Sequence, residues 1–163
     1  MANQTLEANL ARLNAIEDIK QLKARYCAYC DAGYDADGIA SLFVEDAVWD
    51  GSRPGFGRYV GREAIRKFFR EEFGSFLLVA HLVMNPIIVV NGNTATGQWR
   101  LFAPLTVKNP TGQPEARWLL GSYDESYVEH NGTWLFKTLT FNAQFYAAHE
   151  TGWAQGSISD MHE

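Results

Sequence analysis

The first third of the chain repeats apolar residues with the period of an α-helix. In "NAIEDIKQLKARYCAYCD" (residues 14–31), apolar side chains recur every three or four positions, at Ile16, Ile19, Leu22, Tyr26, Tyr29 and Cys30. The pattern predicts a long amphipathic helix that ends before "DAGYDADG" (31–38), which is rich in turn-forming residues. We expect two further helices over "IASLF" (39–43) and "GREAIRKFFREEF" (61–73), with a short strand over "EDAVWDG" (45–51) between them.

Long extended runs fill the rest of the chain, in 77–104 and again in 116–148. Each contains an Asn-Gly pair, Asn91-Gly92 in the first and Asn131-Gly132 in the second, and Asn-Gly between strands is a strong hairpin signal. The strands, of roughly 10–14 residues, exceed the usual length and must twist and bend. The sequence therefore predicts an α+β fold in which N-terminal helices pack on a long, curved, mainly antiparallel sheet whose open end is a pocket.

Two-residue turns at these Asn-Gly pairs would fix which side chains share a face of the sheet. The first hairpin would then place His81 beside Val83, Asn85, Gln98, Arg100 and Phe102, and the second would place Tyr123 beside Tyr127, Phe136, Asn142 and Tyr146. A bulge would shift these faces, and Asn85-Pro86 is a candidate for one because proline donates no ladder hydrogen bond.

Length and composition fit one globular domain over residues 1–163, with a core at about 14–145 and a mobile tail at about 147–163. The net charge of −5 argues against nucleic acid or an anionic membrane surface as a partner.

The N-terminus has no apolar signal segment and no stretch is long enough to span a membrane, so we expect a cytoplasmic protein. Exposed aromatics on the outer sheet face predict a homo-oligomer, a trimer or a dimer.

Two features at the end of the first helix bear on chemistry. Cys27 and Cys30 have a C-x-x-C spacing, but they sit inside a helical pattern without a second ligand pair, so we expect buried thiols rather than a metal or redox site. Asp31 is unusual because the C-terminus of a helix carries partial negative charge. Its carboxylate must be solvated, paired with a cation or held for chemistry.

The order and spacing of four segments resemble the SnoaL-like branch of the NTF2-like superfamily. These are "IEDIKQLKARYCAYCDAGYDADGIASLFVEDAVWDG", "GREAIRKFF", "HLVMNPIIVVNGNTATGQW" and "GSYDESYVEHNGTWLFKTLTF", within residues 14–145. The resemblance implies a cone of helices and curved sheet around an apolar pocket. Members include scytalone dehydratase, bile-acid 7α-dehydratase, a dehydrochlorinase, ketosteroid isomerase and polyketide cyclases, together with non-catalytic subunits, so the fold does not settle the function.

Lyases of this group carry an Asp just after the first helix and a His at the start of a long strand, and Asp31 and His81 match these positions. Tyr26 matches a tyrosine of some dehydratases, and Trp49 matches an aromatic on the short strand. The dehydrochlorinase has a Lys where Tyr26 stands and a late Arg with no match here. The isomerase pattern would use Asp50 as its base but lacks a matching second acid.

The resemblance implies a cofactor-independent dehydratase with no metal, acting on a hydrophobic ring-containing molecule of aromatic, polyketide or steroid-like kind. His81 would remove a proton next to a carbonyl, and Asp31 would orient the imidazole. Tyr26 and Asn142 would donate hydrogen bonds to the enolate, and Trp49, Phe68 and Phe69 would form apolar walls.

Simpler interpretations stay open for these residues. His81 is also consistent with a histidine packed in the core, and Trp49 with an aromatic of the core. Asp31 is also consistent with a turn residue, and Asn142 with a strand residue that faces solvent. The alternatives to a dehydratase are a non-catalytic ligand-binding or subunit-interaction module, and an isomerase or polyketide cyclase. Contact between His81 and Asp31 inside one pocket would favour an enzyme.

Overall fold

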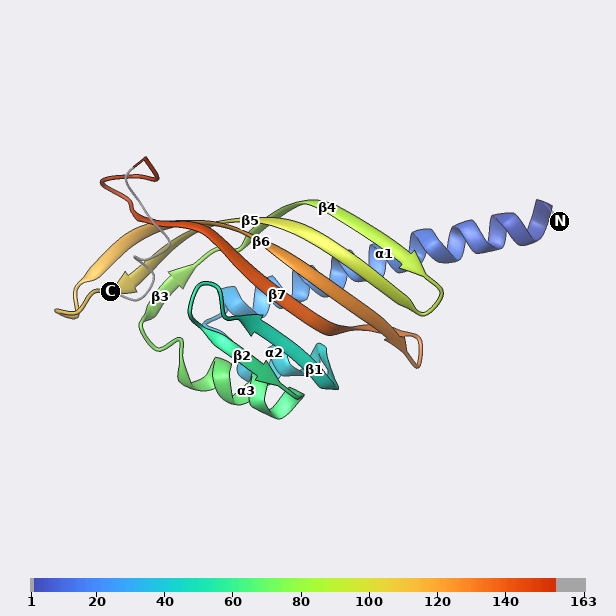
Figure 1. The fold of residues 1–163 in the computed structure, drawn as a ribbon, viewed down its shortest axis with the longest axis horizontal. Helices are drawn as coiled ribbons and strands as arrows, with labels where there is room; N and C mark the ends of the chain where they lie inside the picture. The colour runs from blue at the N-terminus through green and yellow to red at the C-terminus, as the bar shows by residue number, and fades with distance from the viewer. Residues whose placement is uncertain (1, 155–163) are drawn as a thin grey trace.

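The computed structural model describes residues 2–154 and contains the three predicted helices (Figure 1). Helix α1 (Ala2–Asp31) ends where the apolar pattern ends. Helix α2 (Ala36–Ser41) begins earlier than expected, because the Asp35 side chain accepts the N–H of Gly38 and caps the helix. Helix α3 (Arg62–Glu71) buries Ile65 and the two phenylalanines that follow.

The strands described within residues 2–154 form one curved sheet in the order β2-β1-β7-β6-β5-β3, with β4 also paired to β5. The pairing of β1 with β7 is parallel and the others are antiparallel. The predicted α+β class is confirmed. The strand bounds are β1 (Phe43–Gly51), β2 (Gly57–Val60), β3 (Phe76–Val79), β4 (Leu82–Asn91), β5 (Thr94–Lys108), β6 (Pro114–His130) and β7 (Thr133–Ala148).

Both predicted hairpins are present, but the first has a different register. In the β6–β7 hairpin, Asn131 and Gly132 form the turn with φ of 51° and 77°. In the β4–β5 hairpin, Asn91 pairs with Thr94, so the turn is Gly92-Asn93 and not Asn91-Gly92. A shift of one residue exchanges the faces of a strand.

The predicted bulge at Asn85-Pro86 is confirmed, since the β4–β5 register shifts between Met84 and Ile87 and Asn85 has a φ of 53°. Val83 consequently pairs with Leu101, and β5 buries its odd-numbered residues. The prediction that His81 shares a face with Gln98, Arg100 and Phe102 is wrong, because these three side chains lie on the outer face.

Two bulges also move the faces of β7. Tyr127 pairs with Phe136 and Ser126 with Thr138, which leaves Lys137 as an extra residue. Beyond this bulge Tyr123 pairs with Phe141, which is buried, and Asn142 turns to the outer face. A second shift follows at Gln144 and returns Tyr146 to the inner face. Asn142 therefore does not share a face with Tyr123, contrary to the sequence prediction.

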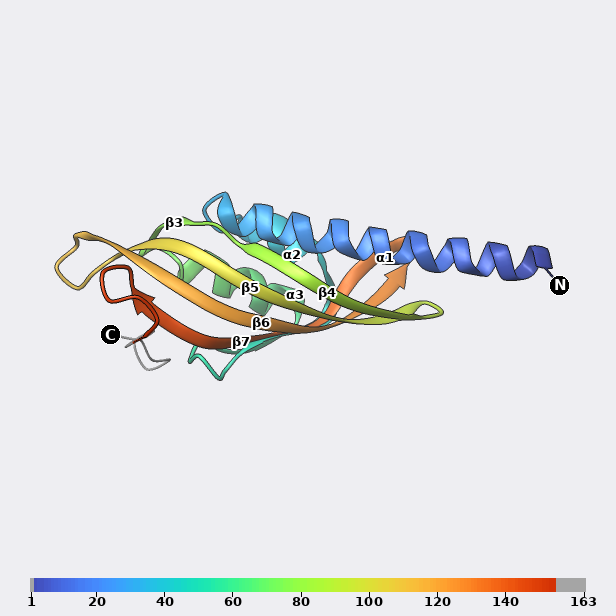
Figure 2. The same ribbon diagram turned by 90° about the horizontal axis from the view of Figure 1, so that it is seen from above.

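Helix α1 lies along the inner face of the sheet and extends beyond it at its N-terminal end (Figure 2). Its second half packs on the sheet through Ile19, Leu22 and Tyr26, whereas residues 5–14 are exposed. A buried ion pair also joins helix to sheet: Lys23 Nζ lies 2.5 Å from Glu125 Oε1, and both side chains are fully buried. Tyr127 donates a hydrogen bond to the same carboxylate.

Three observations bear on the remaining sequence expectations. Cys27 and Cys30 are buried free thiols, as predicted. No helix in the described range is long and apolar enough to cross a membrane. Strand β7 continues to Ala148, and residues 155–163 of the predicted mobile tail lie outside the described residues.

Candidate active site

Asp31 and His81 meet where α1 ends and β4 begins. Asp31 Oδ1 lies 2.7 Å from His81 Nδ1, and the two carboxylate oxygens accept the backbone N–H of His81 at 3.0 and 3.2 Å. The carboxylate therefore fixes both the backbone and the ring of His81. The His81 side chain is 8% exposed and that of Asp31 is 35% exposed, so the pair spans the boundary between solvent and interior.

The hydrogen bond to Asp31 determines the tautomer of a neutral His81. A carboxylate only accepts hydrogen bonds, so the ring proton resides on Nδ1 and the lone pair on Nε2. His81 lines the aromatic cavity described next. A basic nitrogen at such a wall is suited to take a proton from a bound molecule.

The cavity lies between α1, the inner face of the sheet and the segment that joins α3 to β3. It has room for about 50 Å³, far less than the roughly 300–1,000 Å³ of typical ligand sites. Aromatic side chains fill the remaining space, so a ring compound enters only if some of them move. The lining residues are Tyr26, Tyr34, Trp49, Phe56, Phe69, Phe73, Phe76, Val79, His81, Leu101, Leu105, Leu119, Tyr123, Phe141 and Tyr146.

Four tyrosines give this apolar cavity its polar character. Burial raises the pKa of Tyr26, Tyr34 and Tyr123 well above the usual value, and raises the pKa of Tyr146 to about 12. All four hydroxyls consequently keep their proton at neutral pH and can donate it in a hydrogen bond. The cavity is thus lined by neutral donors and one histidine.

Tyr26, Trp49 and Phe69, predicted to bind substrate, line the cavity. Trp49 Nε1 donates to the Tyr26 hydroxyl at 3.1 Å, which fixes both side chains. Phe68 is not part of the lining. Its ring stacks on Tyr59 with centroids 4.2 Å apart and contacts Trp49 at 4.6 Å, so it supports the wall from behind.

Asn142 lies outside the cavity, and its predicted role toward an enolate is wrong. Its amide donates to Asp124 Oδ2 at 3.0 Å on the outer face, where Gln98 donates to Asp124 Oδ1. The physical reason is the bulge at Lys137, which no sequence pattern marks. Asp50 also lies elsewhere, since its carboxylate accepts the N–H of Ser52 and faces Arg58.

Sequence reasoning did not assign Tyr34, Phe73, Phe76 or Tyr146 to the site. The Tyr34 and Phe73 rings stack with centroids 3.9 Å apart, and Tyr34 lies edge-on to His81 at 6.3 Å. Tyr34 has a φ of 58°, rare for a non-glycine residue, in the turn after α1. A tyrosine inside "DAGYDADG" was the available signal, because turn segments are otherwise polar.

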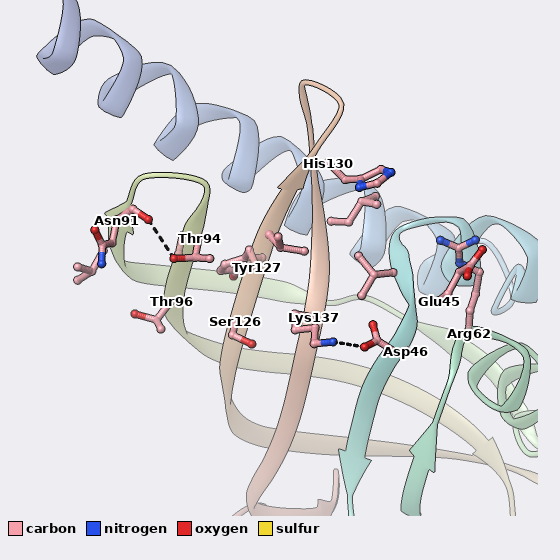
Figure 3. Close-up of a pocket in the computed structure, with 15 residues that line it drawn as sticks. Glu45, Asp46, Arg62, Asn91, Thr94, Thr96, Ser126, Tyr127, His130 and Lys137 are labelled. Atoms are coloured by element: carbon pink, nitrogen blue, oxygen red, sulfur yellow. Dashed lines mark hydrogen bonds and ion pairs between the residues drawn. The ribbon is translucent and has the colours of Figure 1, made fainter.

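A larger open hollow of about 1,060 Å³ lies near the hairpin ends (Figure 3). Neither Asp31 nor His81 lines it. Most of its lining side chains, including Thr96, Ser126 and Lys137, belong to the face opposite the core. Lys137 forms an ion pair with Asp46 across it. We place the candidate active site at the smaller cavity, because a more enclosed apolar space joined to an oriented histidine suits acid–base chemistry better than the more open hollow.

Among the described residues, no group of three or more His, Cys, Asp or Glu side chains has an arrangement that would hold a metal ion. Burial raises the pKa of the Cys27 thiol to about 11, so this cysteine is a poor thiolate ligand at neutral pH. The acid–base groups that the cavity presents are therefore His81 and the tyrosine hydroxyls.

Solved structures with the same fold include proteins named as lyases. A scytalone dehydratase candidate from Novosphingobium aromaticivorans DSM 12444 is 24% identical, with a TM-score of 0.73 over 83% of this chain and 87% of that one. A hexachlorocyclohexane dehydrochlorinase (LinA) of type 2 is 18% identical, with a TM-score of 0.77 over 86% and 92%. An NTF2-like protein from N. aromaticivorans is 22% identical, with a TM-score of 0.67 over 98% and 96%.

Identities at this level show the fold and not the reaction. No curated protein matches the chain. The model of the SnoaL-like domain family matches residues 11–140, which include Asp31, His81 and all of the cavity-lining residues except Phe141 and Tyr146. The chain belongs to the SnoaL-like family and has the NTF2-like fold.

Proposed function

We propose that the protein is a cofactor-independent lyase that eliminates water from a hydrophobic, ring-containing β-hydroxy ketone. The observation that carries this proposal is the hydrogen bond of 2.7 Å between Asp31 and His81 at the wall of an aromatic cavity. It gives one imidazole a fixed tautomer, a basic nitrogen and a partner that stabilises its positive charge.

In the proposed reaction, His81 Nε2 takes a proton from the carbon next to the substrate carbonyl. The C–H electron pair forms an enolate, which a tyrosine hydroxyl of the cavity stabilises, and Tyr26 is the proposed donor. The enolate then re-forms the carbonyl and expels the β-hydroxyl, which receives the proton from the imidazolium and leaves as water. Asp31 stays ionised and stabilises the imidazolium between the two transfers.

Entry of a ring compound requires the cavity to open. Phe73 and Phe76 flank the segment between α3 and β3, and both pack their rings on Tyr34. They lie outside helices and at a strand end, so their side chains can move with less disturbance than the walls formed by α1 and the central strands. We propose that substrate replaces these rings beside His81.

The test is turnover of 3-hydroxy-1-tetralone, a two-ring β-hydroxy ketone that yields 1-naphthol after loss of water. We expect the wild-type protein to accelerate naphthol formation and His81→Gln to abolish the acceleration. His130→Gln is the matched control, since His130 lines the large open hollow instead. Equal loss in both variants, or turnover that survives in His81→Gln, would contradict the assignment of His81.

A non-catalytic ligand-binding or subunit-interaction module is the second candidate, favoured by the small volume of the cavity. It predicts that aromatic ligands bind while no ketone tested is converted. The isomerase alternative loses support because Asp50, its expected base, bonds to Ser52 outside the cavity.

We further propose that the chain self-associates through the outer face of the sheet. In β4, which lies beside β5 near the edge, the aliphatic side chains Leu82, Met84, Ile87 and Val89 are between 40% and 63% exposed. A continuous apolar row of this kind is typical of a protein interface. Sedimentation of the purified chain tests whether it forms a dimer, a trimer or neither.

A further inference from the structure

A charged pair that the proposed reaction does not use lies beside one of the cavity-lining residues, Tyr146. Arg117 Nη2 lies 2.7 Å from Glu115 Oε1, and both side chains are partly buried, with exposures of 17% and 25%. The Arg117 guanidinium also lies 4.8 Å from the centroid of the Tyr146 ring, which lines the cavity. Buried charges are normally paired, and here each of the two partly buried charges has the other as its partner.

The register of the sheet relates this pair to His81. The pairings of β3 and β4 with β5 place His81 opposite Ala103. Ala103 of β5 pairs with Leu119 of β6, and Leu119 pairs with Tyr146 of β7. These four residues form one row across the inner face. Arg117 belongs to the next inner row, two residues from Leu119 along β6.

The neighbours of Arg117 confirm that it faces the cavity end. It pairs across the strands with Leu105, and Leu105, Leu119 and Tyr146 all line the cavity. Burial raises the pKa of Tyr146, and of the two nearby charges Arg117 opposes this rise while Glu115 adds to it. The pair therefore lies next to the cavity wall formed by Leu105, Leu119 and Tyr146.

The separation fits a molecule of two or three fused rings. Two strand spacings and two residues along a strand put the backbones of His81 and Arg117 roughly 12 Å apart, and their side chains converge from the same concave face. A ring system with its reactive carbons at His81 would bring its far end to Arg117.

We infer that Arg117 is a specificity-determining residue, and that the ligand of this cavity is a fused-ring compound carrying a carboxylate opposite its reactive end. The inference rests on the proposed function for the position of the reactive end. Guanidinium binds carboxylates in a planar, two-bond arrangement, so a ligand carboxylate takes the position that Glu115 now holds. Glu115, which is partly exposed, turns to solvent when this exchange occurs.

Calorimetric titration with 2-naphthoate and with its neutral methyl ester, at pH 7.5, tests this inference. We expect the wild type to bind 2-naphthoate about tenfold more tightly than the ester, because its carboxylate gains charge-assisted hydrogen bonds to Arg117 at the expense of the Arg117–Glu115 contact. Arg117→Gln should remove this preference and leave ester binding unchanged. Glu115→Gln should increase it, because a competitor for the guanidinium is gone.

Arg100→Gln is the matched control, since it removes an arginine from the outer face of the neighbouring strand. An Arg117→Gln variant that keeps the carboxylate preference would overturn the inference, as would a wild type that binds the ester equally well or binds neither compound. His81→Gln separates the two proposals: it should retain the preference while losing turnover. If turnover fails in the wild type but the preference is present, only the proposed function fails.

Discussion

Asp31 combines a structural and a proposed chemical role in one carboxylate. It accepts the backbone N–H of His81 with both oxygens and holds the imidazole with one of them. At the C-terminal end of α1 a carboxylate is electrostatically unfavourable, and the bonds to His81 offset that cost. The position thus makes sense only together with a residue that lies fifty positions later in the chain.

Replacing Asp31 with Asn should separate these roles. Asn retains an oxygen for the backbone N–H, so we expect a loss of about 1 kcal/mol in the free energy of unfolding. It lacks the charge that orients and stabilises the imidazolium, so turnover should fall by about 10²- to 10⁴-fold. Thermal unfolding and the naphthol assay measure the two effects.

Asp124→Asn serves as the control for Asp31→Asn, because Asp124 also accepts two side-chain hydrogen bonds but on the outer face. Its turnover should equal that of the wild type. If Asp31→Asn does not fold, or if it remains fully active, Asp31 is a structural residue and the proposed dyad is wrong.

At the scale of residues, the sequence singled out Asp31, His81, Tyr26, Trp49 and Phe69, and the structure places all five in or beside the aromatic cavity. Apolar periodicity and family resemblance identified where these residues lie along the chain. The Asn142 prediction failed because a single extra residue at Lys137 reverses the faces beyond it. Tyr34 escaped notice because its burial depends on rings of α3 and β3 that are distant in sequence.

Among the elements, α1 has the largest influence on the site, since it carries Tyr26 and ends at Asp31. Its contact with the sheet is fixed by Lys23, whose Nζ lies 2.5 Å from Glu125 and 3.3 Å from the centroid of the Tyr123 ring. A buried charge pair adds little net stability over an apolar pair, but loss of one partner is strongly destabilising because it leaves an uncompensated buried charge. The pair joins α1 to β6 eight residues before Asp31.

Lys23→Met should lower the free energy of unfolding by about 3–5 kcal/mol, because Glu125 is then a buried and unpaired charge. The double variant Lys23→Met/Glu125→Gln removes that charge and keeps an acceptor for Tyr127, so it should recover most of the loss. Denaturant unfolding of the three proteins measures the effect. A double variant as unstable as Lys23→Met would show that the ion pair is not what joins α1 to the sheet.

The β4–β5 turn depends on Gly92, which has a φ of 60° and open space around its Cα. Gly92→Ala should therefore destabilise the fold by about 1 kcal/mol through backbone strain and not through a clash. Gly74 is also surrounded by open space but lacks a positive φ, so Gly74→Ala should change stability by less than about 0.5 kcal/mol. Equal unfolding midpoints for the two variants would contradict this account of the turn.

The hairpins illustrate what a sequence can and cannot fix at the scale of elements. Asn-Gly located both turns, but the signal for Asn91-Gly92 was one residue away from the true Gly92-Asn93 turn. Asn-Gly-Asn offers two overlapping turns, and burial of Leu101 on the inner face selects between them. Packing over the whole sheet, which no local motif records, decided the register.

The whole molecule is a curved sheet around an aromatic core, and its tyrosines make that core sensitive to high pH. Burial raises the pKa of Tyr26, Tyr34 and Tyr123, and raises those of Tyr146 to about 12 and Cys27 to about 11. In the unfolded chain these groups lose protons near their usual values, at about pH 10 for tyrosine. The folded state holds the protons more tightly.

The contribution of these groups to the free energy of unfolding should consequently be constant below about pH 8. It should fall as the pH rises beyond about 10. The sign follows because the unfolded state then binds fewer protons than the folded state. Urea unfolding between pH 7 and 11, with tyrosinate absorbance at each pH, measures the effect. Ionisation of all seven tyrosines of the folded protein near pH 10 would contradict the burial of these side chains.

Long strands, early helices and aromatic richness were sufficient to predict this architecture. They did not predict the size of the cavity. Its volume of about 50 Å³ results from the stacking of Tyr34, Phe73 and their neighbours, which depends on side-chain directions from α3, β3 and the turns around them. The proposed opening of this cluster links the architecture to the chemistry at His81.

The most direct test of the dyad follows exchange of a carbon-bound proton. We would incubate 1-tetralone with the protein in D₂O and measure deuterium uptake next to the carbonyl by NMR, for wild type, His81→Gln and His130→Gln. The account predicts accelerated uptake with wild type and His130→Gln, and background uptake with His81→Gln, because His81 is the base that removes this proton. Background uptake with all three proteins, or unchanged acceleration with His81→Gln, would contradict it.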